Sequence, residues 1–178
     1  MTVPSQAVDI VKKWEGFVGH TYKDAVGVFT IGYGTTAEAD VGIIPIPGMT
    51  ITEKQATVYL MRGLEKFADQ IRPAITAPIN DNEFSAFLSL AYNIGPGAFK
   101  KSTALKRFNA GDRLGAAEAL TWFDKAGGRT LRGLQERRQE EKALFLTQTT
   151  RKPVMGFFAR LWARIVDAIR YRIDRSAN

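Results

Sequence analysis

Residues 17–36 limit the possible folds of this chain more than any other stretch. β-forming side chains recur here with glycines between them, whereas the residues on both sides follow a helical period. Such a pattern is typical of two or three short strands joined by tight turns. The β-formers are Tyr22, Val26, Val28, Phe29, Ile31 and Tyr33, and the glycines are Gly27, Gly32 and Gly34.

A short helix is predicted before this stretch. Its apolar residues fall on one face over residues 5–14, Ser5 is placed to cap it, and Gly16 is placed to end it. Glu15 would therefore lie at the C-terminal end of a helix, beside a break.

Helices are also predicted after the β-rich stretch. Thr52 and Gln55 form a capping box, which predicts a long helix that runs to about Ile71. Everything after Pro78 has a helical period, with the last helix over residues 131–147. The caps of the intervening helices are expected at Asn80 or Asn82, at Ser102 and at Asp112.

The predicted fold is therefore α+β and mainly helical. A small N-terminal β lobe precedes a long linking helix and a larger helical lobe, all within residues 1–147. Two lobes leave a cleft between them, and ligands bind preferentially in such clefts. Residues 148–178 are expected to form a separate linker and helix.

The composition excludes several kinds of site. The chain has no cysteine and one histidine, so we expect no disulfide, no metal site and no cofactor. The N-terminus lacks a basic region followed by an apolar run, and no stretch is long enough to span a membrane. We therefore expect synthesis in a cytoplasm without a signal peptide. If the target is a bacterial cell wall, in the periplasm, release would need a separate pore protein.

Two carboxyl groups in the N-terminal region have the placement that glycoside hydrolysis needs. One carboxyl must stay protonated to give its proton to the leaving oxygen, and the other must be ionised. Glu15 is flanked by Trp14 and Phe17, an apolar setting that favours the protonated acid. Asp24 lies in the glycine-punctuated strands, and Thr30 follows on the next strand. Position alone does not decide the matter, because solvated carboxylates are common at helix ends and turns.

Motifs in both halves of the chain add a resemblance. The first half carries EG at 15–16, YKD at 22–24, Gly27 and TIGYG at 30–34. The second half carries FLSLAYNIG at 87–95, FKKST at 99–103, and a stretch from Trp122 through AGG at 126–128 and GL at 133–134 to RR at 137–138. In this order the motifs resemble the phage-type lysozymes (endolysins), glycoside hydrolase family 24, over roughly residues 5–147.

The resemblance implies a lysozyme-like fold and a function. Peptidoglycan would be cut at the β-1,4 bond between N-acetylmuramic acid and N-acetylglucosamine. Glu15, Asp24 and Thr30 stand at the family's catalytic spacing, so Glu15 would be the general acid and Asp24 would handle water with help from Thr30. Family members of this kind are often inverting, which requires the two carboxyls to lie about 6.5–9.5 Å apart.

Further residues are expected to contact the glycan or to support the acid. For several of them a structural role is an equal or stronger alternative. Tyr92 and Asn93 could be a core aromatic and a helix end, Gly127 and Gly128 a plain turn, and Arg137 either a support for Glu15 or a solvated residue. The predicted substrate-binding set is Tyr33, Tyr92, Asn93, Lys125, Gly127, Gly128 and Arg137.

The C-terminal tail carries most of the net charge. Seven basic and two acidic residues follow Thr150, so five of the seven net positive charges lie there. Residues 154–173 have the pattern of an amphipathic helix with a basic face, as on an anionic membrane or lipopolysaccharide surface; packing back on the main domain is the alternative. The predicted membrane-binding residues are Phe158, Arg160, Leu161, Trp162, Arg164, Ile165 and Ile169.

Three other functions compete with the hydrolase. A lytic transglycosylase would cleave the same bond without water, which the presence of Asp24 and Thr30 argues against. A non-catalytic wall-binding protein would not need these residues. A basic membrane-active or nucleic-acid-binding protein is the third, but no nucleic-acid motif is present and the charge is concentrated in the tail. We expect peptidoglycan as partner, no nucleic acid, and a monomer.

Overall fold

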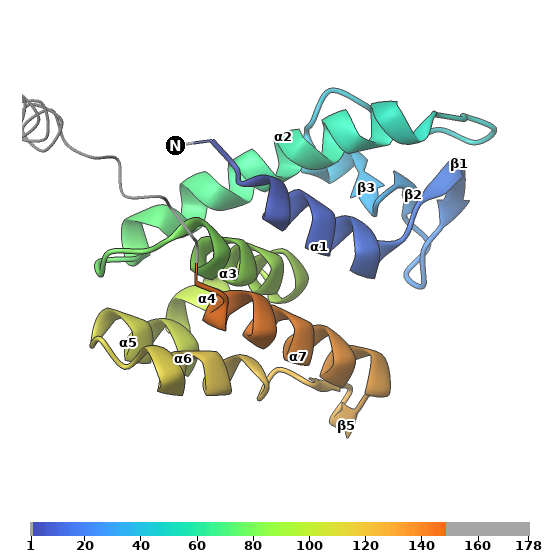
Figure 1. The fold of residues 1–178 in the computed structure, drawn as a ribbon. Coiled ribbons are helices and arrows are strands. Elements are labelled where there is room, and N and C mark those ends of the chain that lie inside the picture. Colours follow the sequence, from blue (N-terminus) through green and yellow to red (C-terminus); the bar gives the residue numbers. More distant parts are fainter. Residues whose placement is uncertain (1, 149–178) are drawn as a thin grey trace, which may run out of the picture. The chain divides into compact units, whose positions relative to one another are not determined.

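The computed structural model describes residues 2–148 (Figure 1). The predicted amphipathic helix over 154–173 and its membrane-binding residues lie outside this range. The α+β fold class is confirmed. The α-helices are α1 (Ser5–Glu15), α2 (Glu53–Ile71), α3 (Asp81–Ile94), α4 (Pro96–Lys101), α5 (Thr103–Asn109), α6 (Arg113–Leu120) and α7 (Arg132–Leu146), with short 3-10 helices η1 (Ala37–Ala39) and η2 (Arg72–Ala74).

The β-rich stretch forms an antiparallel sheet of β1 (Val18–Lys23), β2 (Phe29–Gly32) and β3 (Thr35–Thr36) in that order. Tyr22 lies opposite Thr30 in the register of β1 and β2, and the register shifts between Val18 and Tyr22. The sheet follows directly on the end of α1. The β1–β2 turn, residues 24–28, therefore follows the helix end that carries Glu15 after a single short strand.

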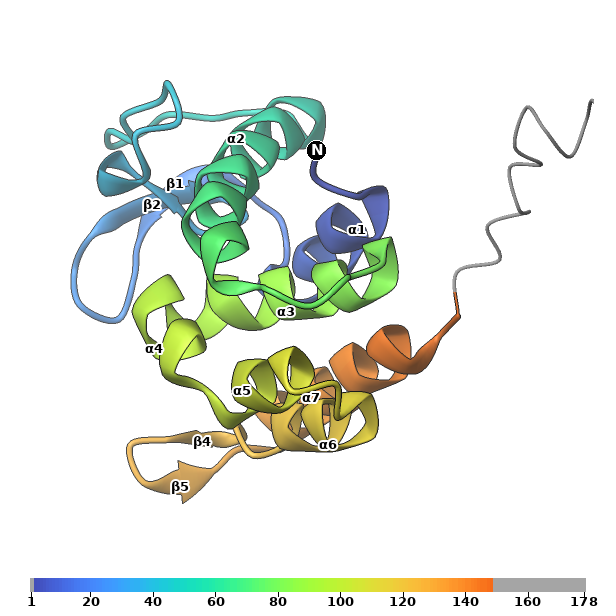
Figure 2. The same cartoon turned by 90° about the vertical axis from the view of Figure 1, so that its left-hand side faces the viewer.

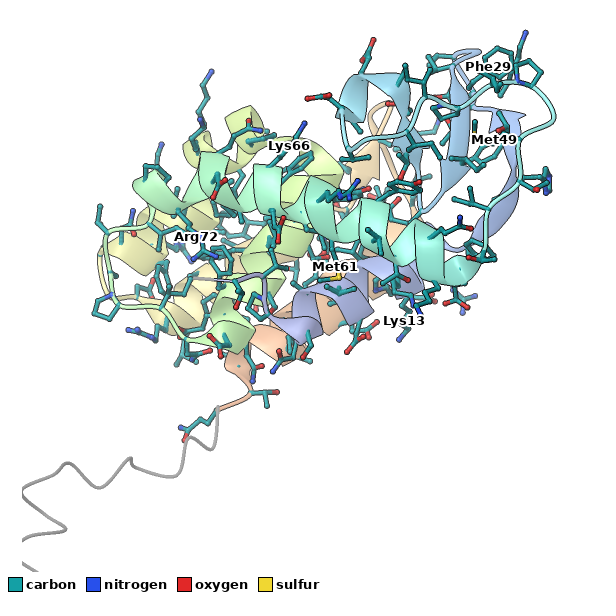
Figure 3. All side chains as sticks on the ribbon, turned by 90° about the horizontal axis from the view of Figure 1, so that it is seen from above. Lys13, Phe29, Met49, Met61, Lys66 and Arg72 are labelled. Carbon is teal, nitrogen blue, oxygen red and sulfur yellow. The ribbon has the colours of Figure 1, made fainter. Side chains whose placement is uncertain are left out.

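The long helix α2 connects the sheet with the helical lobe. Figure 3 shows Phe29 and Met49 near one end of α2 and Arg72 at the other. Its first turn carries the predicted capping box, since Thr52 Oγ1 accepts from the Gln55 backbone and the Gln55 side chain accepts from the Thr52 backbone. One face of α2 is buried, and it packs on β2, α3 and α4.

α3 lies in the middle of the helical lobe, with α5, α6 and α7 on one side of it (Figure 2). Every residue from Asn82 to Ala91 is buried, which is typical of a helix surrounded by other elements. Phe87 is the centre of an aromatic cluster. Its ring lies 5.1 Å from that of Phe99, 5.2 Å from that of Phe108 and 5.1 Å from that of Phe145.

The predicted helix starts are confirmed except at α1. Asn80, Ser102 and Asp112 each accept a backbone N–H hydrogen bond at the start of a helix. Ser5 does not cap α1, because the cap position is held by Pro4, whose side chain has no acceptor.

The expectation that the chain is only helical after Pro78 is also wrong. β4 (Lys125–Ala126) and β5 (Arg129–Thr130) pair as a hairpin. Gly127 and Gly128, at φ 56° and 76°, make its two-residue turn, which needs positive φ at both positions.

Candidate active site

Glu15 is the last residue of α1, and the helix ends at Gly16, whose φ is 72°. Its Oε1 accepts a 2.8 Å hydrogen bond from Nη1 of Arg137 on α7. A Cβ atom built on Gly34 would lie 3.9 Å from the other oxygen, Oε2. The Glu15 side chain is 24% exposed and that of Arg137 is 4% exposed. One carboxyl oxygen is therefore bound to a buried guanidinium, while part of the side chain still reaches solvent.

The expected apolar neighbours of Glu15 have other contacts. The Trp14 indole donates to Oε2 of Glu140 at 2.9 Å, and the Phe17 ring lies 5.7 Å from that of Tyr33. The prediction of an apolar setting for Glu15 is wrong, because α7 brings a charged partner to it.

Asp24 holds the turn between β1 and β2 together. Its Oδ1 accepts hydrogen bonds from the backbone N–H groups of Val26 at 3.0 Å and Val28 at 2.8 Å. Its own backbone N–H donates to the Val28 carbonyl at 3.0 Å. The turn thus fixes the orientation of the carboxylate and leaves its second oxygen, Oδ2, for another partner.

Thr30 is buried on β2, with 3% of its surface exposed. Its hydroxyl donates to the Val28 carbonyl at 3.1 Å, so the direction of its lone pairs is fixed as well. A hydroxyl that is committed as a donor can still accept a hydrogen bond from water. The backbone of Val28 therefore connects the two side chains. Its N–H donates to the Asp24 carboxylate, and its carbonyl accepts from the Thr30 hydroxyl.

Tyr22 is a further residue of this region, and the sequence interpretation did not single it out as a site residue. It is the cross-strand partner of Thr30. Burial raises the pKa of the Tyr22 phenol first, and the negative charges of Asp24 and Glu15 raise it further. The Tyr22 phenol is thus within range of the charges of both carboxyls of the predicted pair.

A cavity of about 550 Å³ opens beside Gly34. One wall is the segment from Gly34 to Val41, which follows β2, and the other is α2. Tyr92 of α3 lines it as well, with its ring 5.1 Å from that of Phe67. Lys66, labelled on α2 in Figure 3, lies at its edge and donates to Oδ2 of Asp40 at 2.7 Å. The residues that line the cavity are Gly34, Thr35, Thr36, Glu38, Ala39, Asp40, Val41, Tyr59, Leu60, Gly63, Lys66, Phe67, Gln70 and Tyr92.

The profile of the phage lysozyme family matches residues 12–141, a range that contains Glu15, Asp24, Thr30 and Arg137. The chain belongs to the phage lysozyme family. Membership confirms the predicted enzyme class, a glycoside hydrolase of the lysozyme type.

Individual relatives agree over the same region. The chain is 36% identical to an endolysin of Acyrthosiphon pisum secondary endosymbiont phage 1, over 82% of this chain and 98% of that protein. It is also 36% identical to the endolysin of Salmonella phage P22, over 83% and 99%. An endolysin of Bacillus phage PZA is 36% identical as well, but this chain spans only 59% of its length. The crystal structure of a P22 lysozyme variant superposes with a TM-score of 0.76, at 36% identity, over 83% of this chain and 99% of that one.

Two tyrosines of this phage lysozyme homologue are tied to each other. The Tyr92 hydroxyl donates to the Tyr33 carbonyl at 3.1 Å, and burial raises the pKa of Tyr92 well above its ordinary value. Tyr33 itself is only 2% exposed, and its hydroxyl donates to Oε1 of Glu53 at 2.7 Å. Of the two predicted substrate-binding tyrosines, Tyr92 lines the cavity and Tyr33 is held inside the core.

The other predicted substrate residues fall in two places. Arg137 contacts Glu15, and Asn93, in the last turn of α3, accepts a 3.1 Å hydrogen bond from Nη2 of Arg138. Lys125, Gly127 and Gly128 are exposed on the β4–β5 hairpin, apart from the residues that line the cavity. The structure thus brings Arg137 to Glu15 and Tyr92 to the cavity, and it does not bring the hairpin residues into the cavity.

Two features are absent from residues 2–148. No group of three or more histidine or acidic side chains in this range is placed to hold a metal ion. No helix in the same range is long and apolar enough to cross a membrane.

Proposed function

We propose that this chain cuts peptidoglycan at the β-1,4 bond between N-acetylmuramic acid and N-acetylglucosamine, with Glu15 as the general acid. The observation that carries the proposal is the pair of surroundings of the Glu15 carboxyl group, in a chain that belongs to a family of lysozymes. Arg137 binds one of its carboxyl oxygens inside the protein, and the other lies near Gly34, a residue that lines a cavity of about 550 Å³. A general acid needs a fixed orientation and an open oxygen, and this arrangement offers both.

In the proposed reaction the proton resides on Oε2 of Glu15, and Oε1 continues to accept from Arg137. The proton passes to the glycosidic oxygen as its bond to the anomeric carbon breaks. A water molecule attacks the same carbon from the opposite face, and Asp24 takes the proton that this water loses. Thr30 would hold the water by accepting a hydrogen bond from it. The outcome of a single displacement is inversion at the anomeric carbon.

The cavity is proposed to hold the sugar rings next to the cleaved bond. Its walls combine aromatic faces, Tyr59, Phe67 and Tyr92, with the polar side chains of Glu38, Lys66 and Gln70. Sugar sites use such a mixture, because apolar ring faces pack on aromatics while hydroxyl groups need hydrogen bonds. Asn93 and the hairpin residues Lys125, Gly127 and Gly128 would contact the glycan chain only beyond this cavity.

The tail supplies a second, separate part of the proposal. The basic segment after Thr150 would bind an anionic outer membrane or lipopolysaccharide, because five net positive charges coincide there with an amphipathic pattern. The protein would act as a monomer, be made in the host cytoplasm, and reach the wall through a separate pore protein.

The test of the catalytic proposal compares Glu15→Gln with the unaltered protein on purified peptidoglycan. Turnover should fall at least about a hundredfold, because general acid catalysis contributes roughly 10²–10⁴. The thermal midpoint should change little. Near-normal release of reducing sugar by Glu15→Gln would refute the assignment of the acid.

The same digest separates the competing activities. New reducing ends support a hydrolase, and anhydro-sugar ends would instead support a lytic transglycosylase. Binding without any release of sugar would support a wall-binding protein.

A further inference from the structure

A buried charge cluster lies behind Glu15. Its members are Arg137, Arg138 and Glu141, all on α7, together with Ser89 on α3. Arg138 and Glu141 are 0% exposed and Arg137 is 4% exposed. Helices of this length usually bury an apolar stripe, whereas the buried residues of α7 are three charged side chains and Phe145. Burial of ionised groups is costly unless they are paired, so such a cluster calls for an explanation.

Glu141 is the centre of the cluster. Its Oε1 accepts a 2.6 Å hydrogen bond from the Ser89 hydroxyl and a 3.2 Å hydrogen bond from Nε of Arg137. Its Oε2 lies 3.0 Å from Nε of Arg138. One carboxylate thus faces two guanidinium groups. Burial lowers the pKa of Arg138 to about 10, against the opposing effect of the Glu141 charge.

Arg137 connects this cluster with the proposed acid. Its Nε edge is bound by Glu141, its Nη2 donates to the Ser89 carbonyl at 3.3 Å, and its Nη1 donates to Glu15. The guanidinium is planar and its donors are fixed relative to one another. Fixing the Nε edge and Nη2 therefore also fixes the direction in which Nη1 points.

The charges give Glu141 a second effect. Arg137 and Arg138 together carry two positive charges, and Glu141 offsets one of them. Without Glu141, both guanidinium groups would favour an ionised Glu15, since a nearby opposite charge stabilises the charged form of a carboxyl group. A general acid must instead keep its proton until the bond breaks.

We propose that Glu141, supported by Ser89, is a positioning residue for the general acid: it fixes Arg137 toward Glu15 and offsets enough of its charge for Glu15 to retain a proton. The inference rests on the proposed role of Glu15. Glu141 is not proposed to touch the substrate; it acts mainly through Arg137, and its charge also offsets that of Arg138.

Other ionisable groups also lie near the series of contacts from Glu141 through Arg137 to Glu15. Tyr22 on β1 and Tyr92 on α3 feel the charge of Glu15, and Arg137 affects Tyr92 as well. Glu118 on α6 is bound to Lys142 and is half exposed, and Glu140 is bound to Lys13 of α1. None of these replaces the negative charge that Glu141 places beside Arg137.

The sign of the effect follows from this arrangement. Loss of the general acid's proton sets the alkaline limb of the pH–activity profile. Glu141→Gln removes a negative charge and keeps the shape, so Glu15 should lose its proton at a lower pH. The alkaline limb should move toward acid by about 0.5–1 pH unit, within the range that neighbouring charges produce. The kcat should fall while KM changes little.

The experiment measures pH–activity profiles of the full chain on purified peptidoglycan. Glu136→Gln is the matched control, because Glu136 is on the same helix, is exposed, and pairs with Arg132. A moved alkaline limb in Glu141→Gln with an unmoved limb in Glu136→Gln supports the proposal. Equal profiles in the two variants overturn it.

A second comparison tests the route through Arg137. In an Arg137→Gln background, Glu141→Gln should move the limb clearly less, because only the charge of Arg138 then remains to be offset. The same movement in both backgrounds would show that Glu141 does not act through Arg137. If Glu141→Gln fails to fold, Ser89→Ala decides instead. It removes a hydrogen bond that favours the ionised Glu141, so the limb should move in the same direction by a smaller amount, and no movement overturns the proposal.

Failure of this inference is distinct from failure of the proposed function. An active Glu15→Gln variant would refute the assignment of Glu15 as the general acid. An inactive Glu15→Gln variant, together with an unmoved pH profile of Glu141→Gln, would refute only the proposed role of Glu141.

Discussion

Nη1 of Arg137 lies 2.8 Å from Oε1 of Glu15, although 122 residues separate the two in the chain. The contact joins the end of α1 to α7. The orientation of the proposed acid therefore depends on the packing of α1, α3 and α7, and not on the β lobe alone.

Asp24 has a structural and a proposed chemical role, and two substitutions separate them. Asp24→Asn keeps an oxygen that can accept from Val26 and Val28, but it cannot take a proton from water. Asp24→Ala loses both functions. Both variants should be severely impaired on peptidoglycan, and only Asp24→Ala should also lose about 1–2 kcal/mol of stability, because two hydrogen bonds of the turn are lost. Activity assays with thermal melts make the comparison, and a fully active Asp24→Asn would show that Glu15 has another partner.

Gly34 tests the space beside the acid. Gly34→Ala would place a methyl group 3.9 Å from Oε2 of Glu15, at a φ of 82° that costs about 1–3 kcal/mol for other residues. Gly111→Ala is the control, since Gly111 has a φ of 85° and open space around it. Both variants should melt at lower temperature, but only Gly34→Ala should lose activity beyond the loss of folded protein. Equal activity per folded molecule in the two would argue against an open site at Oε2.

Low pH should weaken the contacts that Glu53 of α2 makes with Lys12 of α1 and with Tyr33. Lys12 binds Oε1 of Glu53 at 2.9 Å, and this bond, with one from Tyr33, holds the pKa of Glu53 below its ordinary value of 4.5. The carboxylate contributes fully to stability above that value, and its contribution is lost as the pH falls through the lower folded-state pKa. The melting temperature of Glu53→Gln should therefore approach that of the unaltered protein between about pH 5 and pH 3. Glu65→Gln, an exposed change on the same helix, serves as control, and a constant gap for Glu53→Gln would contradict the expectation.

Removal of the tail should separate hydrolysis from approach to the cell. Cutting the chain after Thr150 removes no proposed catalytic residue, so purified, soluble glycan should still be cleaved. Attack on whole Gram-negative cells from outside should weaken. The electrostatic part of this difference should fade with salt, as the screening length falls from about 10 Å at 0.1 M to about 3 Å at 1 M.

Two results would contradict this view of the tail. If the truncated chain unfolds or loses activity on soluble glycan, the tail contributes to the packing of the domain. If it lyses cells from outside as well as the full chain does, the basic charge has another purpose.

Local features of this protein were determined by the sequence alone. The Thr52–Gln55 capping box, the Asn80, Ser102 and Asp112 caps, and the glycine-punctuated strands each involve residues within a few positions of one another. Their hydrogen bonds form wherever the local chain takes the right conformation. The motif spacing of Glu15, Asp24 and Thr30 was equally visible, and it led to the family.

Only the tertiary structure decided the partners of the charged groups. A helical period predicts which residues of α7 share a face, but it does not predict that Arg137, Arg138 and Glu141 are buried there, because burial of charge depends on which partners the neighbouring helices supply. Ser89 and Glu15 provide them from α3 and α1. Likewise Tyr33 belongs to a motif that suggests a substrate contact, yet its ring is buried and Glu53 at the start of α2 binds its hydroxyl. Such pairings join residues 20 to 122 positions apart, and packing alone brings them within hydrogen-bond distance.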